Sequence, residues 1–368
     1  MVRGDLRSER NDGDRRRIAD GTQNALARCC GGSGPAVRTY FRPLVQHGAT
    51  RPAGAVPLAG QPLWFTHVEA LRRGSEPEIV AASDVPSDHL SRLIQPRADV
   101  AGLDMQVPHI MGILNATPDS FSDGGVHSSV DAARVAALNM VAQGATILDI
   151  GGESTRPGAD FVPVKEEIAR TRPLIEAIRS ETGALISIDT RKADVAKAAC
   201  DAGAGLVNDV SGFTFDPELA PFCAAQGVPV CVMHMQGDPA TMQINPRYDN
   251  VLLDVYDFLE GQIALLERLG LSRDQIVVDP GIGFGKTEDH NLTLLRNISL
   301  FHGLGCPILL GVSRKGFIGT IGKEPRKTAR APGSIAVALA GLSQGVQIIR
   351  VHDVAETSQA LRLWAAVR

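Results

Sequence analysis

The sequence predicts an α/β fold: a (β/α)8 TIM barrel formed by residues 107–368, with a small N-terminal appendage and a disordered N-terminal tail before it. Eight short apolar, β-rich runs recur after residue 107, and stretches with helical periodicity separate them. Strand–helix alternation indicates a parallel sheet. Eight such units in about 260 residues match the size of a closed barrel. A doubly wound open sheet is the alternative.

The eight runs and the clearest helices can be placed by residue number. The predicted strands are 110–114, 146–150, 185–188, 206–207, 228–233, 276–278, 308–312 and 348–351. The clearest predicted helices are 130–143, 166–182, 251–269 and 334–344.

The first 106 residues divide into two parts. Residues 1–35 are rich in Arg, Asp, Gly and Ser, and we expect a disordered tail. Residues 36–106 are expected to form a small extension, with short strands at 63–65 and 79–80 and a helix at 87–94. So small a segment has little core of its own. Trp64, Phe65, Ile79 and Val80 are therefore expected to be buried against the barrel's N-terminal end or its outer helices.

Composition and charge limit the partners. The net charge of −4 gives no sign of nucleic-acid binding, and no apolar run reaches the roughly 18–20 residues that span a bilayer. The N-terminus lacks the apolar core of a signal peptide, so a cytoplasmic protein is expected. The six cysteines form no CxxC pair and no cluster with metal spacing, so we expect reduced thiols. Cys231 and Cys306 are expected to be buried as small hydrophobic residues.

Polar residues follow all eight predicted strands, and in a barrel these strand ends converge on one mouth, where active sites of this fold are built. Any one of them could cap a helix or lie in solvent, but capping does not explain the whole set. Asp189, Asn208, Asp279 and Lys315 suit a flat heterocycle with amide-like and guanidine-like edges. The anion-binding candidates are Asn115, Arg350 and His352. Two Gly/Ser/Thr/Asp-rich loops, after the first and second strands, are expected to close over a substrate.

A glycine-rich stretch at residues 280–287 superficially suggests nucleotide binding. A true P-loop requires Gly where Pro280 stands. The Gly281-x-Gly283-x-Gly285 spacing also misses the dinucleotide fingerprint by one residue. Both nucleotide hypotheses are set aside.

Seven motifs then occur in order over residues 112–354. They are GILNATPDSFSDGG (112–125), GGESTRPGA (151–159), IDTRK (188–192), NDVSG (208–212), DPGIGFGK (279–286), SRKGFIG (313–319) and RVHDV (350–354). This ordered set resembles that of the dihydropteroate synthases. The resemblance implies a transferase of folate biosynthesis that condenses 6-hydroxymethyl-7,8-dihydropterin pyrophosphate with 4-aminobenzoate. It also implies Mg²⁺ as cofactor, a homodimer formed through helices of the barrel's later half, and C–O cleavage largely before amine attack.

The resemblance assigns roles to matching positions. It places Asp189, Asn208, Asp279 and Lys315 around the pterin, with Met233 as an apolar wall. It places the pyrophosphate against Asn115, Arg350 and His352, with Asn115 also contacting Mg²⁺. Around the aminobenzoate it places Phe121, Asp119, Thr155, Arg156, Pro157, Phe284 and Ser313, and Asp119 is also expected to order the first loop and the metal. The residues expected to contribute to catalysis are Asp119, Thr155, Arg156, Lys315, Arg350 and His352.

Two other hypotheses stay open from the sequence. A methyltransferase acting on methyltetrahydrofolate would share the pterin-binding carboxylates, but would not need the Ser313-Arg314-Lys315 motif or the Arg350-x-His352 pair. A catalytically silent pterin-binding paralogue would be expected to lose loop residues such as Asp119, Thr155 or Arg156, all of which are present.

Overall fold

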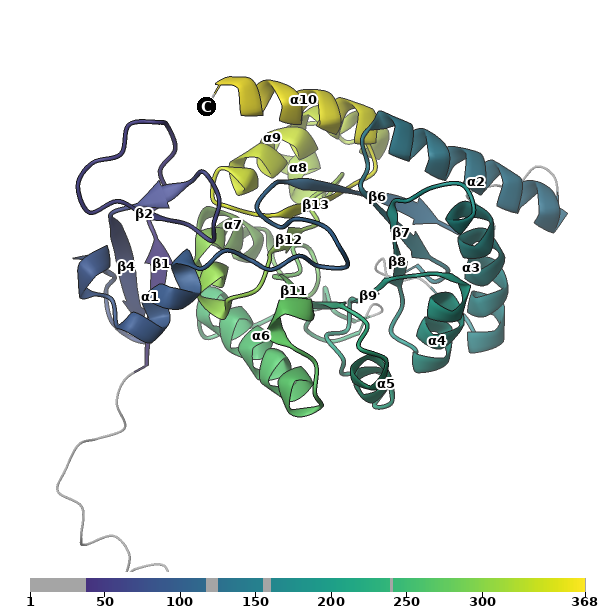
Figure 1. Cartoon of the computed structure of the whole chain (residues 1–368), viewed down its shortest axis with the longest axis horizontal. Helices are drawn as coiled ribbons and strands as arrows, with labels where there is room; N and C mark the ends of the chain where they lie inside the picture. The colour runs from purple at the N-terminus through teal and green to yellow at the C-terminus, as the bar shows by residue number, and fades with distance from the viewer. Residues whose placement is uncertain (1–37, 117–124, 155–159, 239–240, 368) are drawn as a thin grey trace, which may run out of the picture. The chain divides into compact units, whose positions relative to one another are not determined.

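The computed structural model describes residues 38–116, 125–154, 160–238 and 241–367, and residues 125–129 by their backbone only (Figure 1). Its barrel strands are β6 (His109–Asn115), β7 (Ile147–Gly151), β8 (Leu185–Asp189), β9 (Leu206–Asp209), β10 (Val230–Met233), β11 (Ile276–Asp279), β12 (Leu309–Leu310) and β13 (Ile348–Val351).

These eight strands run parallel in the order β11-β10-β9-β8-β7-β6-β13-β12. The two ends of this sheet meet, because Val278 in β11 forms a parallel bridge with Ile308, just before β12. The amide of Val278 also donates to the carbonyl of Pro307 at 2.9 Å. The predicted (β/α)8 barrel is therefore confirmed, and the open-sheet alternative is wrong.

Helices surround the barrel (Figure 1). They are α2 (Gly125–Gln143), α3 (Val164–Arg179), α4 (Ala193–Ala202), α5 (Leu219–Gln226), α6 (Val251–Arg268), α7 (Glu288–Arg296), α8 (Gly316–Ile321), α9 (Ala331–Leu342) and α10 (Val354–Val367), with 3-10 turns η3 (Arg273–Gln275), η4 (Ile298–Leu304) and η5 (Lys327–Ala329). Local chemistry fixes several of their ends. The side chain of Asn250 caps α6 by accepting from the amide of Leu253. Helix α4 ends at Ala202 and is followed by Gly203, whose φ of +116° favours glycine.

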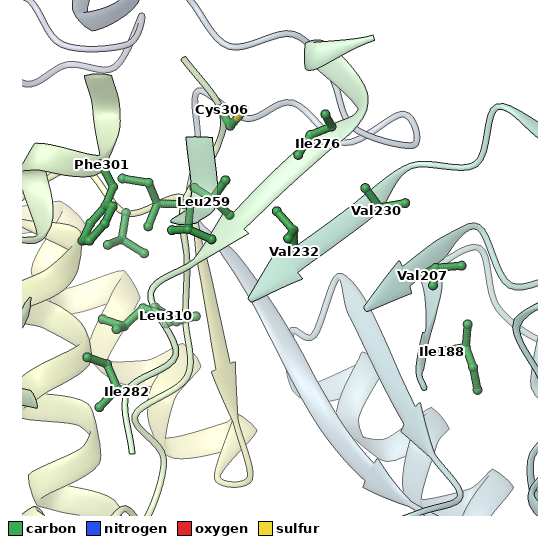
Figure 2. Packing of buried hydrophobic residues seen from close by; sticks show 14 of the residues in the cluster. Ile188, Val207, Val230, Val232, Leu259, Ile276, Ile282, Phe301, Cys306 and Leu310 are labelled. Carbon is green, nitrogen blue, oxygen red and sulfur yellow. The ribbon is translucent and has the colours of Figure 1, made fainter. Parts of the chain in front are cut away.

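The outward face of the strands forms the main hydrophobic core, because successive side chains in a strand point to opposite faces. Ile188, Val207, Val232 and Ile276 on the strands pack in one cluster with Leu259 of α6 (Figure 2). Phe301 of η4 and the buried thiol of Cys306 belong to the same cluster. Cys306 is thus buried as a small hydrophobic residue, as predicted.

The N-terminal end of the barrel interior is a second, separate apolar layer. Its inward side chains are those of Met111, Ile147, Leu206, Cys231, Val277, Leu309 and Ile348. Val100 and Met105, from the segment just before β6, join this cluster and are fully buried. These two residues close the N-terminal end of the barrel. Cys231 is buried here, as predicted.

The extension forms β1 (Thr39–Pro43), β2 (Val56–Pro57), β3 (Trp64–Phe65), β4 (His67–Arg72), β5 (Glu78–Ala81), η1 (Ala82–Asp84) and α1 (Ser87–Ile94). Strands occur where the sequence predicted them, and α1 spans the predicted 87–94. Leu58, Phe65, Val68 and Leu93 form a small core within the extension. The expected burial of Ile79 is wrong: its side chain is 64% exposed, because it lies on the outer face of the sheet beside its register partner Glu69, while Val68 on the other face is buried.

Polar contacts attach the extension to the outside of the barrel. The Tyr40 hydroxyl donates to the carboxylate of Asp257 in α6 at 2.9 Å. Ser299 in η4 donates to the carbonyl of Pro43 at 3.0 Å. Arg97 donates to the carbonyl of His302 at 3.0 Å. The extension thus contacts the outer helices, and residues 100–105 close the N-terminal end, as expected for the segment. Phe65, however, was expected to be buried against the barrel and is buried in the core of the extension itself.

Other expectations concern the chain as a whole. The tail expected at 1–35 lies outside the described residues. Within the described ranges, no helix combines the length and apolar character needed to cross a membrane. Cys200, Cys223, Cys231 and Cys306 are free thiols.

Candidate active site

The barrel interior becomes polar two residues beyond the apolar layer. The inward positions there carry Asp149, Ser187, Asn208, Asp279 and Arg350. Asp149 is fully buried; it accepts from the Ser187 hydroxyl at 2.6 Å and from the Asn208 amide at 3.3 Å. Arg350 Nε donates to Asp149 Oδ2 at 2.6 Å. Asp149 is therefore the centre of a hydrogen-bonded network inside the barrel.

Asp189, at the end of β8, has one carboxylate oxygen engaged and one unsatisfied. Its Oδ2 accepts from Arg350 Nη2 at 2.7 Å. Its Oδ1 is buried, and among the described residues no donor reaches it. Burial raises the pKa of this carboxyl to about 7, against the opposing charge of Arg350. A buried acceptor without a partner is expensive, so this atom marks a place where a ligand's N–H would bind.

Asp279 and Met233 lie side by side, because they are register partners at the ends of β11 and β10. Asp279 Oδ1 accepts from the amide of Gly281 at 2.7 Å, and burial raises the pKa of its carboxyl. Asp189 and Asn208 are register partners in the same way. The structure therefore brings these four predicted residues together at the C-terminal end of neighbouring strands.

The residues after β11 form a tight turn, residues 280–286, which we call the glycine loop. Gly281 has a φ of +69°, and a Cβ there would lie 1.9 Å from the carbonyl oxygen of His234. The ammonium of Lys286 fills the centre of this loop: it donates to the carbonyls of Gly281 at 2.9 Å and Phe284 at 3.0 Å, and contacts His234 Nδ1 at 2.9 Å. The glycines of this P-loop-like stretch thus allow the loop to turn tightly around the ammonium of Lys286.

Lys315 lies against the glycine loop. Its ammonium is 4.1 Å from the centre of the Phe284 ring, a cation–π distance. Gly283 has a φ of +83°, which favours glycine, and a Cβ there would lie 3.1 Å from the Lys315 side chain. The structure therefore brings together Lys315, which was expected at the pterin, and Phe284, which was expected at the aminobenzoate.

The end of β13 carries the predicted anion-binding residues. His352 contacts Ser313, with Nδ1 and Oγ 2.9 Å apart. Burial opposes the charge of Arg350, but Asp149 and Asp189 outweigh it and raise the pKa of its guanidinium. The neighbouring Arg314 instead pairs with Asp353. The side chain of Arg350 thus lies deeper than the sequence suggested, between two carboxylates.

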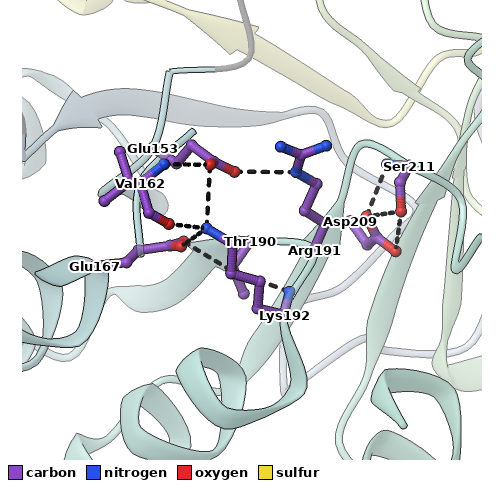
Figure 3. A network of polar contacts seen from close by, with 8 residues as sticks. All are labelled: Glu153, Val162, Glu167, Thr190, Arg191, Lys192, Asp209 and Ser211. Carbon is purple, nitrogen blue, oxygen red and sulfur yellow. Dashed lines mark hydrogen bonds and ion pairs between the residues drawn. The ribbon is translucent and has the colours of Figure 1, made fainter. Parts of the chain in front are cut away.

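A buried ionic network supports the loop that follows β7 (Figure 3). The Lys192 ammonium contacts Glu153 at 3.1 Å and Glu167 at 2.6 Å, and donates to the carbonyl of Val162 at 2.6 Å. Glu153 also accepts from the amide of Val162 at 2.9 Å and pairs with Arg191 at 3.0 Å. Burial opposes ionisation of Glu153, but Arg191, the Val162 amide and Lys192 outweigh it and lower its pKa. Glu153 and Val162, on either side of residues 155–159, are thereby held together.

Five predicted site residues lie outside the described residues: Asp119, Phe121, Thr155, Arg156 and Pro157. Asn115 is half-buried at the end of β6 and pairs in register with Gly151. In the described part of the chain, no group of three or more His, Cys, Asp or Glu side chains could hold a metal ion.

Asp149, Lys286 and the network around Glu153 and Lys192 were not predicted from the sequence. The signal for Asp149 was present: an acid in the middle of the apolar run ILDIG. Lys192 contacts Glu153 across 39 residues of the chain and Lys286 contacts His234 across 52, and no local pattern predicts these two contacts.

Comparisons with known proteins agree with this geometry. Residues 111–352 match the family model described as "Pterin binding enzyme". The chain is 46% identical over 267 residues to the dihydropteroate synthase of Escherichia coli K12, covering 72% of this chain and 94% of that protein. It resembles the Xanthomonas albilineans dihydropteroate synthase solved with 4-aminobenzoic acid (TM-score 0.70, 44% identity, 74% of this chain, 98% of that one). The same organism's enzyme in complex with 7,8-dihydropteroate gives a TM-score of 0.67 at 41% identity, with the same coverage.

The matched region contains seven of the barrel strands, all but the first two residues of β6, and the polar interior described above, and the relatives match over nearly their whole length. The chain therefore belongs to the pterin-binding enzymes, as a member of the dihydropteroate synthases.

Proposed function

We propose that the barrel mouth joins 6-hydroxymethyl-7,8-dihydropterin pyrophosphate to 4-aminobenzoate, giving 7,8-dihydropteroate and pyrophosphate. The observation that carries the proposal is the unsatisfied Oδ1 of Asp189, buried beside Asn208 at the C-terminal end of the sheet. A flat heterocycle with N–H donors on one edge would satisfy this acceptor. The family's known substrate is such a heterocycle.

In this proposal the pterin ring enters the polar interior. Asp189, Asn208 and Asp279 accept from or donate to its amide and guanidine-like edges, and Met233 packs against its face. Lys315 lies at the ring's outer edge, held by Phe284 at 4.1 Å. Because burial raises the pKa values of Asp189 and Asp279, a ligand that donates hydrogen bonds to the carboxylate forms recovers part of the cost of burying them.

The reaction needs charge stabilisation more than nucleophile activation. The bond between the pterin methylene carbon and the pyrophosphate oxygen breaks, and the oxygen takes the electron pair. The neutral arylamine nitrogen then attacks the methylene carbon and loses a proton. Arg350 and His352 are proposed to hold the departing pyrophosphate. Asp149 and Asp189 engage Nε and Nη2 of Arg350, so the pyrophosphate would approach its third nitrogen, Nη1.

Further assignments complete the proposal. Asn115 and pyrophosphate oxygens would hold Mg²⁺, which when bound neutralises charge on the leaving group. Asp119, Thr155, Arg156, Pro157 and Phe121 are proposed to frame the aminobenzoate with Ser313 and Phe284. We also propose a cytoplasmic homodimer.

The test is pyrophosphate release by the purified chain with each substrate alone and with both. Release that needs both substrates, with one pyrophosphate per dihydropteroate formed, supports the proposal. Release from the pterin substrate alone, or none under conditions where both substrates bind, contradicts it.

A further inference from the structure

The extension contacts the barrel at the start of helix α6, next to the segment that leads back to the mouth. Arg73, just after β4, places Nη1 2.6 Å from Asp254 Oδ1 and Nη2 2.6 Å from Asp257 Oδ2. These carboxylates are three residues apart and so lie on one face of α6. One guanidinium therefore joins the extension to two points on this helix.

Asp254 also binds the backbone of the residues just before α6. Its other oxygen, Oδ2, accepts from the backbone amides of Asp249 at 3.0 Å and Asn250 at 3.1 Å. Asn250 is itself the cap of α6. Arg73 and the residues that enter α6 are therefore held by opposite oxygens of one carboxylate.

The segment just before α6 holds the glycine loop at two places. The Tyr248 hydroxyl donates to the carbonyl of Gly285 at 2.7 Å, and the Gln243 amide donates to the carbonyl of Gly283 at 2.7 Å. The Tyr248 ring also packs edge-on against His290, with ring centres 4.9 Å apart. Any shift of residues 248–250 would therefore be transmitted to the loop that carries Phe284 and packs against Lys315.

We infer that Arg73 is a positioning residue for the pterin site, acting through Asp254 and Tyr248 on the glycine loop. Arg73 lies outside residues 111–352, the region that the family model matches, so this connection is a property of the extension. The inference rests on the proposed function, in which Asp279 and Lys315 beside this loop bind the pterin. The extension would then contribute to substrate affinity as well as to stability.

The test compares Arg73→Ala with Arg72→Ala in the full-length chain. Arg72 is the adjacent residue, but it pairs with Glu78 and Thr39 inside the extension. We expect Arg73→Ala to raise the Kd for pterin, measured by calorimetry, about three- to tenfold. KM for the pterin substrate should rise by the same factor with kcat nearly unchanged, and Arg72→Ala should behave as wild type. Arg73→Lys, which can reach one carboxylate, should recover part of the affinity.

A double-mutant cycle tests whether the effect of Arg73→Ala on Kd acts through Tyr248. Tyr248→Phe removes the hydrogen bond to Gly285, so its effect on Kd should not add fully to that of Arg73→Ala. Equal Kd values for Arg73→Ala and Arg72→Ala, or full additivity in the cycle, would overturn the inference even if Arg73→Ala melts earlier. Asp279→Asn separates the two failures: if it too leaves Kd unchanged, the proposed pterin site is wrong. If it weakens binding and Arg73→Ala does not, only the role of Arg73 fails.

Discussion

The two ends of the barrel interior are lined by the same strands but differ in chemistry. At the N-terminal end the inward residues are apolar, as in Ile147, Leu206 and Val277. Two residues later on the same strands they are Asp149, Asn208 and Asp279. Every second residue of a strand faces inward. On five of the eight strands, one change from an apolar to a polar inward residue therefore separates the packed end from the polar end, while β6, β10 and β12 carry Ile113, Met233 and Gly311 at the next inward position.

The two ends also differ in energetic balance. The apolar layer stabilises the fold by roughly 25 cal/mol for each Å² it removes from water. The polar layer opposes folding unless each group is paired. Asp189 Oδ1 has no partner among the described residues, and burial raises the pKa values of Asp189 and Asp279. The difference indicates that the N-terminal end stabilises the fold, while the polar C-terminal end lowers the free energy of unfolding and provides groups that can bind a ligand.

Arg350→Ala should have the largest effect, because Arg350 both neutralises buried carboxylates and is proposed to bind the pyrophosphate. Its removal leaves Asp149 and Asp189 buried without their cation, so the free energy of unfolding should fall by about 3–5 kcal/mol. Pterin pyrophosphate should also bind more weakly. Denaturant unfolding and calorimetry measure the two effects. Wild-type stability would show that the paired carboxylates do not depend on Arg350.

Met105→Ala tests whether the apolar N-terminal end contributes to stability without affecting pterin binding. Met105 is fully buried at the N-terminal end, and its truncation should lower the free energy of unfolding by about 2–5 kcal/mol. Pterin affinity at a temperature where the variant is folded should stay within twofold of wild type. Met105→Leu is the control and should lose less than about 1.5 kcal/mol. A parallel loss of affinity would show that the two ends are coupled.

Asp189 gives the smallest effect, a pH dependence with opposite signs for binding and stability. Its folded-state pKa of about 7 is above the unfolded value. Between these values the folded state binds the proton more tightly, so this group's contribution to stability falls as pH rises through that window. Pterin binding needs the ionised form, so affinity should rise with pH up to about 7, by at most tenfold per unit. Calorimetry from pH 5.5 to 8.5 measures this, and Asp189→Asn should flatten the profile. A wild-type profile already flat over this range would mean that Asp189 does not titrate on binding.

The fold and most of the mouth could be predicted because they depend on local patterns. Each strand is a short β-rich run, and barrel geometry alone brings strand ends such as Asp189 and Asp279 to one place. Asp149 was visible as an acid inside an apolar run, but its partners Ser187, Asn208 and Arg350 come from other strands and could not be read from that run. The pairing of Lys192 with Glu153 and the path from Arg73 to Tyr248 join segments far apart in the chain. Such contacts depend on packing, which no local spacing encodes.

The separation of the two ends is tested most directly by pterin affinity in Asp279→Asn, measured by calorimetry beside its melting temperature. The substitution keeps the side-chain shape, removes the charge and turns one acceptor into a donor. We predict a loss of about 1.5–3 kcal/mol in pterin binding, with a melting temperature equal to or above wild type, because a buried carboxyl with a raised pKa has been removed. Unchanged affinity, or a loss of affinity that only follows a loss of the folded state, would contradict the account.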